Sequence, residues 1–153
     1  MGACCSTTPR ASTPDGFYHA RVTKVINGDT VELAIRIYWD APMMLYRARL
    51  FGINAPEIHP AGLNKETSKL DTPEVRALKK EKEKGVVAKM YLERLMRDYG
   101  PGVGIHTKGN DKYGRLLVDV YANNIFNFRR DAVNINKMMV DGGHAVSYDG
   151  GKR

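Results

Sequence analysis

Three segments in the first third of the chain alternate hydrophobic and polar residues in the way that is typical of β-strands: 17–26, 30–38 and 45–53. Asn27-Gly28 separates the first two segments and is a strong signal for a tight hairpin turn. In the third segment Arg47 and Arg49 share one face, because side chains two residues apart on a strand point the same way. The pattern therefore predicts a β-hairpin followed by one further strand.

A long helix is predicted over residues 73–99, where the hydrophobic spacing changes to the period of an α-helix. Thr72-Pro73-Glu74 supplies an N-cap, a first-turn proline and a first-turn acid. The expected apolar stripe consists of Val75, Leu78, Val86, Val87, Met90, Tyr91 and Leu95. Gly85 is a weak point at which the helix is expected to loosen or break, because glycine disfavours helix interiors.

The remaining elements are a loop over 55–71, short strands over 103–107 and 116–121, and a second helix over 135–141. Gly142-Gly143 ends that helix. The resulting order is three strands, a helix, two strands and a helix, which is the order of an OB-like barrel. We therefore predict a mainly β fold of the α+β class, in which two packed helices accompany a five-stranded OB-fold barrel.

The composition fits one globular domain, with 42% hydrophobic and 27% charged residues in a chain of 153. Residues 16–153 are expected to form this domain after a flexible N-terminal tail, 1–15. Cys4 and Cys5 are adjacent, which excludes a disulfide scaffold and a zinc site with separated ligand pairs. The net charge of +7 favours polyanionic partners such as nucleic acid or an acidic membrane surface.

The tail matches an acylation pattern in which Met1-Gly2 is followed by Ser6. Gly2 would carry a myristoyl chain, and Cys4 and Cys5 are placed for palmitoylation, which makes anchoring stable. An inert tail is the alternative. No segment is long and apolar enough for a transmembrane helix, and no secretory signal is present. We expect a monomeric cytoplasmic protein that acylation anchors to membranes when the host cell is eukaryotic.

In a eukaryotic cell, Gly2→Ala should release the protein from membranes to the cytosol, because the first lipid is lost. Replacing both Cys4 and Cys5 by serine should leave weak, reversible attachment, since one myristoyl chain binds only marginally. Fractionation of cells that express each variant measures both effects. A wild-type protein found entirely in the soluble fraction would show that the tail is not an anchor.

Polar residues also gather where the expected strands end, in four segments: 27–30, 49–57, 111–115 and 143–145. Together they supply oxygen ligands for a hard cation, a carboxylate and two guanidiniums, which is what phosphodiester hydrolysis requires. Arginine binds phosphate oxygens bidentately and stays charged at any working pH. In contrast, the basic run 76–84 alternates with glutamates and predicts a solvated helix face.

Four motifs make the resemblance to a known family specific: VINGDTVEL, RLFGINAPE, DKYGRLLVDVY and NINKMMVDGGHA. In order, spacing and residue type they resemble the thermonuclease family of staphylococcal-nuclease-like proteins, over residues 22–148. The resemblance implies an OB barrel with added helices. It also implies a calcium-dependent phosphodiesterase that cuts DNA and RNA and leaves 3′-phosphate ends.

Site residues follow from the same resemblance. It implies that the catalytic residues are Arg49, Glu57 and Arg115. It implies that calcium is bound by Asp29, Asn54 and the backbone carbonyl of Ala55. It implies that the substrate is contacted by Lys112, Tyr113 and, with a gap of one residue, Tyr148.

Three departures from the family pattern matter. Asn54 replaces a calcium-binding aspartate, which keeps an oxygen ligand but removes one negative charge. Residues 58–84 form a longer segment than in the family and are expected to shape substrate access. The sequence ends at Arg153, so the final helix that the family frequently has is expected to be absent.

Two other function classes remain as alternatives. A non-catalytic OB module would bind single strands or protein partners through the same groove. Retention of the acidic and basic residues implied by the resemblance favours the enzyme. A basic membrane adaptor is the third reading, and it leaves those residues unexplained.

Overall fold

The computed structural model describes residues 15–122 and 132–149. The predicted lipid acceptors Gly2, Cys4 and Cys5 therefore lie outside the described residues. Among the described residues, no helix is long and apolar enough to cross a membrane.

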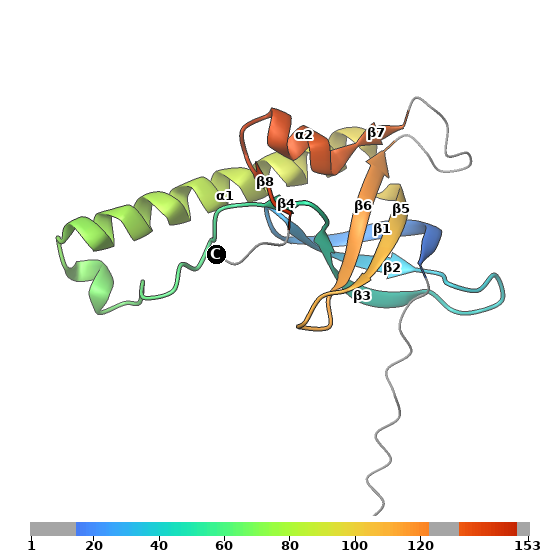
Figure 1. The fold of residues 1–153 in the computed structure, drawn as a ribbon, viewed down its shortest axis with the longest axis horizontal. Helices are drawn as coiled ribbons and strands as arrows, with labels where there is room; N and C mark the ends of the chain where they lie inside the picture. Colours follow the sequence, from blue (N-terminus) through green and yellow to red (C-terminus); the bar gives the residue numbers. More distant parts are fainter. Residues whose placement is uncertain (1–14, 123–131, 150–153) are drawn as a thin grey trace, which may run out of the picture.

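Five strands form a closed barrel: β1 (Gly16–Asn27), β2 (Thr30–Ile35), β3 (Met44–Leu50), β5 (Gly102–Asn110) and β6 (Leu116–Ala122). Their order is β3-β2-β1-β5-β6, and a parallel pairing of β3 with β6 closes the barrel (Figure 1). A short β7 (Val133–Asn134) extends the sheet beside β6, and β4 (Ile53–Asn54) pairs with β8 (Val146–Ser147). With α1 (Pro73–Tyr99) and α2 (Ile135–Asp141), the predicted OB-like α+β arrangement is confirmed.

The hairpin between β1 and β2 forms as predicted, but its turn residues are Gly28 and Asp29 instead of Asn27-Gly28, and β2 ends at Ile35. Gly28 is required by a close approach of neighbouring side chains. A Cβ there would lie 2.7 Å from the Cβ of Ala88 and 2.8 Å from that of Ala55. The turn therefore packs directly against α1.

Alternating side chains of the strands fill the barrel. Val31, Leu33 and Ile35 of β2 are buried, and β6 repeats the pattern from Leu116 onwards. Each fully buried aliphatic side chain contributes about 1.5–3 kcal/mol relative to its exposed state. The alternation of hydrophobic and polar residues that predicted these strands thus also determines which side chains are buried in the barrel.

Helix α1 begins where predicted, because the Oγ1 of Thr72 accepts a hydrogen bond from the Val75 N–H at 3.3 Å. The prediction that it breaks at Gly85 is wrong, since the helix continues unbroken to Tyr99. Part of the predicted stripe is also wrong, because Val86, Val87 and Met90 are exposed. The buried residues are Val75, Gly85, Ala88, Leu92, Leu95 and Met96.

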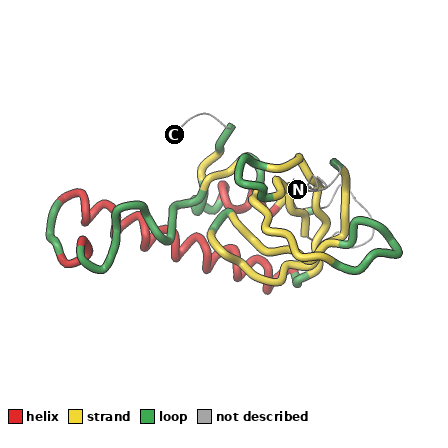
Figure 2. The backbone as a smooth tube through the Cα atoms, turned by 90° about the horizontal axis from the view of Figure 1, so that it is seen from below, coloured by secondary structure: helices red, strands yellow, loops and turns green. Residues whose placement is uncertain are grey.

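This difference follows from which face of α1 meets the barrel. Val86, Val87 and Met90 are interspersed with the buried Gly85, Ala88 and Leu92, and at 3.6 residues per turn they fall on the opposite face of the helix. The C-terminal half of the helix packs on the strands, whereas its N-terminal half and the loop before it extend beyond them (Figures 1 and 2). A 3₁₀ turn, Thr67–Lys69, lies in this loop.

Helix α2 matches its predicted bounds, and the buried Asn136 fixes it to the barrel. The Asn136 amide nitrogen donates to the carbonyls of Phe51 (2.9 Å) and Val118 (3.0 Å), and its oxygen accepts from the Val120 N–H at 3.0 Å. One side chain thereby holds the turn after β3 against β6. The sequence did not predict β4, β7 or β8, because two-residue strands have no pattern to detect.

Candidate active site

The register of the barrel places Asp29 beside Arg49. Thr30 pairs with Arg49 across β2 and β3, so the residue before Thr30 lies next to the guanidinium. Nη1 of Arg49 is 3.2 Å from Oδ2 of Asp29. Nη2 donates to Oδ1 of Asn54 at 2.9 Å. One guanidinium therefore joins two of the predicted calcium ligands.

Asp29 is only 4% exposed, and three donors surround its carboxylate. Besides Arg49, the Thr30 hydroxyl donates to Oδ1 at 2.9 Å and the Ala55 N–H donates to Oδ2 at 3.1 Å. A buried charge is tolerated when it is paired and hydrogen-bonded in this way. Asp29 lies in the β1–β2 turn, and Asn54 and Ala55 lie 25 and 26 residues later in the sequence. The structure brings the three residues together around the Arg49 guanidinium and the Asp29 carboxylate.

Asp111 organises the loop before β6. Its Oδ1 accepts from the N–H groups of Tyr113 and Arg115, each at 2.9 Å, and its Oδ2 accepts from Nε of Arg115 at 2.7 Å. Burial raises the pKa of Asp111, but the hydrogen bonds from Arg115 and Tyr113 and the Arg115 charge outweigh it. The pKa therefore lies below the ordinary carboxyl value of 3.8, and the Arg115 side chain is held in one orientation.

The lowered pKa of Asp111 predicts a pH dependence of stability. A carboxyl whose folded pKa is depressed stabilises the fold above its unfolded pKa, and this contribution disappears as the pH falls through the lower folded value. We expect wild type to exceed Asp111→Asn in unfolding free energy by about 1–2 kcal/mol near neutral pH. The difference should shrink below about pH 4. Urea unfolding of both proteins across this range measures it, and a constant difference would contradict the prediction.

A cleft of about 1250 Å³ lies over this end of the barrel and is lined by residues from β3, β4, the loop before β6 and the segment after β8. The predicted site residues that line it are Arg49, Asn54, Glu57, Lys112, Tyr113, Arg115 and Tyr148. Asp29 is not among the lining residues, because it is buried and meets the cleft through Arg49. Ala55 is also buried, and it lines the adjoining groove instead.

The two arginines share a face for a reason of register. β3 and β6 run parallel with Arg49 opposite Leu117, so Arg115, two residues before Leu117, falls on the same side. Arg47 lies on that side too and lines the cleft. Asp111 also lines the cleft. Sequence analysis did not name these two as site residues. The alternation along the strand, which places Arg47 on the same face as Arg49, could have identified Arg47 as a site residue. The motif DKYGR, which begins with Asp111, could have identified Asp111.

Two tyrosines of the cleft, Tyr113 and Tyr148, are positioned by hydrogen bonds of their backbone N–H groups. Tyr113 is 71% exposed, with Nζ of Lys112 5.0 Å and Cζ of Arg115 5.6 Å from its ring centroid. The Tyr148 N–H donates to the Gly52 carbonyl at 2.8 Å, next to the β4–β8 pairing. An exposed ring flanked by cations suits a base that stacks while its phosphate is bound.

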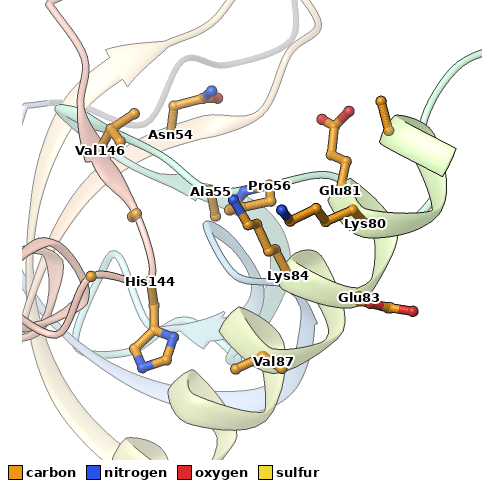
Figure 3. A pocket seen from close by; sticks show the side chains of 13 residues that line it. Asn54, Ala55, Pro56, Lys80, Glu81, Glu83, Lys84, Val87, His144 and Val146 are labelled. Atoms are coloured by element: carbon orange, nitrogen blue, oxygen red, sulfur yellow. The ribbon is translucent and has the colours of Figure 1, made fainter. Parts of the chain in front are cut away.

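A second groove adjoins the cleft and shares Asn54 with it. Figure 3 shows Lys80 and Lys84 extending from α1 towards Ala55 and Pro56. Both lysines are exposed, as are most residues of 76–84, so the prediction of a solvated helix face is confirmed.

Gly85 lies where α1 meets the loop that carries Glu57. A Cβ at Gly85 would be 2.7 Å from the Glu57 carbonyl carbon and oxygen, and 2.8 Å from the Pro56 oxygen. The absent side chain allows the Glu57 backbone to rest on the helix. Gly85, a predicted weak point of the helix, is therefore a contact that sets the position of Glu57.

Comparison with known proteins agrees with this arrangement. Residues 47–152 match the model of the staphylococcal nuclease homologue family. The chain is also 30% identical over 133 residues to an uncharacterized protein of Methanocaldococcus jannaschii, an alignment that covers 86% of this chain and 59% of the relative. The chain thus spans less than two thirds of that relative's length. The chain belongs to the staphylococcal nuclease homologue family.

Proposed function

We propose that this protein is a calcium-dependent nuclease that hydrolyses phosphodiester bonds of DNA and RNA and leaves 3′-phosphate ends. The observation that carries the proposal is that Arg49, Glu57 and Arg115 line one cleft, with Lys112 and Tyr113 at its edge. A phosphate in the cleft would therefore meet two guanidiniums and one carboxylate. Family membership supports the same reaction class.

The arginines are suited to hold the charge that develops on the phosphate. Arg49 donates to Asp29, Asn54 and the Ile53 carbonyl, and Arg115 donates to Asp111. Because a guanidinium carries five N–H groups, each arginine keeps donors for a phosphate. Because these partners fix each guanidinium, the donors are oriented before the substrate arrives. The five-coordinate transition state carries more negative charge than the ground state, so fixed donors stabilise it preferentially.

Glu57 is suited to orient a water molecule and take its proton. It lines the same cleft as the arginines, and its backbone is fixed on α1 at Gly85. Proton removal gives the hydroxide that attacks phosphorus, and the bond from phosphorus to the 5′ oxygen breaks. The 5′ oxygen takes up a proton from water and leaves as a hydroxyl, and the phosphate stays on the 3′ oxygen. A positioned base of this kind contributes roughly 10²–10⁴-fold to rate.

The residues around Arg49 fit calcium by donor type. Asp29, Asn54 and the Ala55 carbonyl offer a carboxylate, an amide and a carbonyl oxygen, and hard oxygens are what calcium prefers. Calcium held there would supply Lewis-acid stabilisation of the phosphate charge. In the described part of the chain no three His, Cys, Asp or Glu residues are grouped for a metal. The proposed ligands are one carboxylate and two neutral oxygens, so the affinity for calcium should be low.

Replacing Asn54 by aspartate should lower the calcium concentration for half-maximal activity. Calcium affinity rises with the number of charged ligands, and this substitution adds one carboxylate at nearly the same size. The new carboxylate would also keep the Arg49 contact, which is 2.9 Å in the wild type. A calcium titration of both proteins at equal ionic strength decides the matter. An unchanged or higher midpoint for the variant would remove Asn54 from the metal site.

Digestion of plasmid DNA and of RNA, with calcium and then with chelator, tests the proposal directly. We expect cleavage that stops on chelation and products that accept a 5′ label without prior phosphatase but resist 3′ extension. Activity that survives chelation would contradict calcium dependence. Strand binding without cleavage at any calcium level would instead favour the non-catalytic OB module.

A further inference from the structure

The connection between β2 and β3, together with the first two residues of β3, exposes five large apolar side chains. Trp39 is 89% exposed and Tyr38 is 65% exposed. Met43, Met44 and Leu45 follow, each between 46% and 64% exposed. Single exposed apolar residues are common, whereas five within eight positions are a candidate binding surface. We call residues 38–45 the apolar loop.

Backbone contacts give the apolar loop a defined shape. The Ala41 N–H donates to the Tyr38 carbonyl at 3.1 Å, which closes a turn with Trp39 and Asp40 at its tip. Nη1 of Arg36 donates to the Trp39 carbonyl at 3.5 Å. Trp39 is thus presented outwards by a turn instead of folding back onto the barrel.

The apolar loop lies at the end of the barrel where the domain begins. Ala20 pairs with Ile35, so the start of β1 runs past the end of β2 towards the loop. Burial raises the pKa of Tyr18, and the nearby charges of Tyr38, Asp15 and Tyr46 raise it further, which places Tyr38 close to β1. The lipid acceptors expected from the sequence precede this same end of β1.

The catalytic cleft lies at the other end of β3. Met44 begins this strand at the apolar loop, and Arg49 and Leu50 end it at the cleft. Arg47 already lines the near side of the cleft, two residues after Leu45. Trp39 and Asp40 at the tip of the apolar loop precede Met44, whereas Arg49 follows Met44 by roughly 17 Å at about 3.3 Å per residue. A bilayer that binds the tip of the apolar loop would therefore lie at the opposite end of β3 from Arg49.

We infer that the apolar loop docks on a lipid bilayer that contains anionic lipids, with Trp39, Tyr38 and Met43 in the headgroup region. Tryptophan and tyrosine favour this region, because their rings are apolar and each carries one polar group. The chain's net charge of +7 adds attraction to an anionic surface. Asp40 at the tip opposes that attraction, so the insertion of the apolar side chains must contribute to binding together with charge.

The chain contains a single tryptophan, so Trp39 reports on its own insertion. Non-acylated full-length protein is mixed with phosphatidylcholine vesicles, with and without phosphatidylserine. We expect a blue shift of Trp39 emission with the anionic vesicles, and quenching by lipids brominated along the acyl chain. Sedimentation of the vesicles measures the bound fraction in parallel.

A Trp39→Ser variant should lower vesicle binding roughly tenfold, because a large apolar side chain is no longer buried in the interface. Met90→Ser is the matched control, since Met90 is 61% exposed on α1 and should leave binding unchanged. Melting temperature and cleavage of short oligonucleotides should be unaffected in both variants, so failure of docking and failure of the nuclease assignment are separable.

Three results would overturn the inference. The first is vesicle binding without a blue shift or quenching, which would indicate attraction through charge alone. The second is equal loss of binding in Trp39→Ser and Met90→Ser. The third is a blue shift that depends on protein concentration in the absence of vesicles, which would assign the apolar loop to contact with a second copy of the chain.

Discussion

Arg49→Lys is expected to lose roughly 10²–10³-fold in turnover while strand binding falls little. Arg49 spans two side-chain partners, with Nη1 at 3.2 Å from Asp29 and Nη2 at 2.9 Å from Asn54. Nη2 also donates to the Ile53 carbonyl at 3.4 Å. A lysine keeps the positive charge beside the buried Asp29, so the fold should persist. However, one ammonium does not reproduce a planar fork that holds both partners and still offers donors to phosphate.

The measurement is single-turnover cleavage of a labelled oligonucleotide, with binding and thermal melting recorded for the same proteins. Arg47→Lys is the matched control, because Arg47 lies on the same face of β3 and lines the same cleft without these two contacts. The turnover of Arg47→Lys should fall by less than about tenfold. Near wild-type turnover in Arg49→Lys, or equal losses in both variants, would contradict the role assigned to Arg49.

Gly85→Ala should reduce turnover by roughly 10–100-fold although the residue is outside the cleft, because small displacements of a catalytic group are costly. The new methyl would meet the Glu57 carbonyl at 2.7 Å and the Pro56 oxygen at 2.8 Å. Backbone atoms do not rotate aside, so the loop that carries Glu57 must move. In the helix itself alanine is favourable by about 1 kcal/mol over glycine, so α1 should not unfold.

Val86→Ala is the control for Gly85→Ala, because Val86 is the next residue of α1 and is 39% exposed. The positioning role predicts that Gly85→Ala lowers kcat more than it raises KM, and that Gly85→Ser behaves alike. It also predicts a changed pH profile of kcat, since Glu57 would meet the water differently. Full activity in Gly85→Ala would show that the loop adapts without displacing Glu57.

The hydrophobic pattern predicted the barrel strands and both helices because each is long enough to show its period. Thr72 and Gly142-Gly143 added the ends of the helices through capping chemistry. The buried face of α1 was predicted less well. Val86 and Val87 are exposed although the adjacent Gly85 and Ala88 are buried. Hydrophobicity favoured the face with the larger apolar side chains, whereas the close approach of α1 to the barrel uses the small residues Gly85 and Ala88.

For the site, motif resemblance predicted residues that the structure gathers in one cleft, and Tyr148, which required a gap of one residue, lies there as well. The supporting contacts were not predictable. The Asn136 amide contacts β6 and the Phe51 carbonyl, a separation of 85 residues in sequence. Gly85 looked like a helix defect, since nothing in the sequence shows that Glu57 rests against it. Such roles depend on tertiary packing, which leaves no local pattern.

The most direct test of the nuclease assignment is the cleavage rate of a single-stranded oligonucleotide in calcium, measured for wild type and Glu57→Gln at the same pH. Glutamine keeps the size of Glu57 but does not accept a proton. The account predicts a loss of roughly 10²–10⁴-fold for Glu57→Gln, with an unchanged melting temperature and retained strand binding. Equal rates for the two proteins, or no cleavage by the wild type, would contradict it.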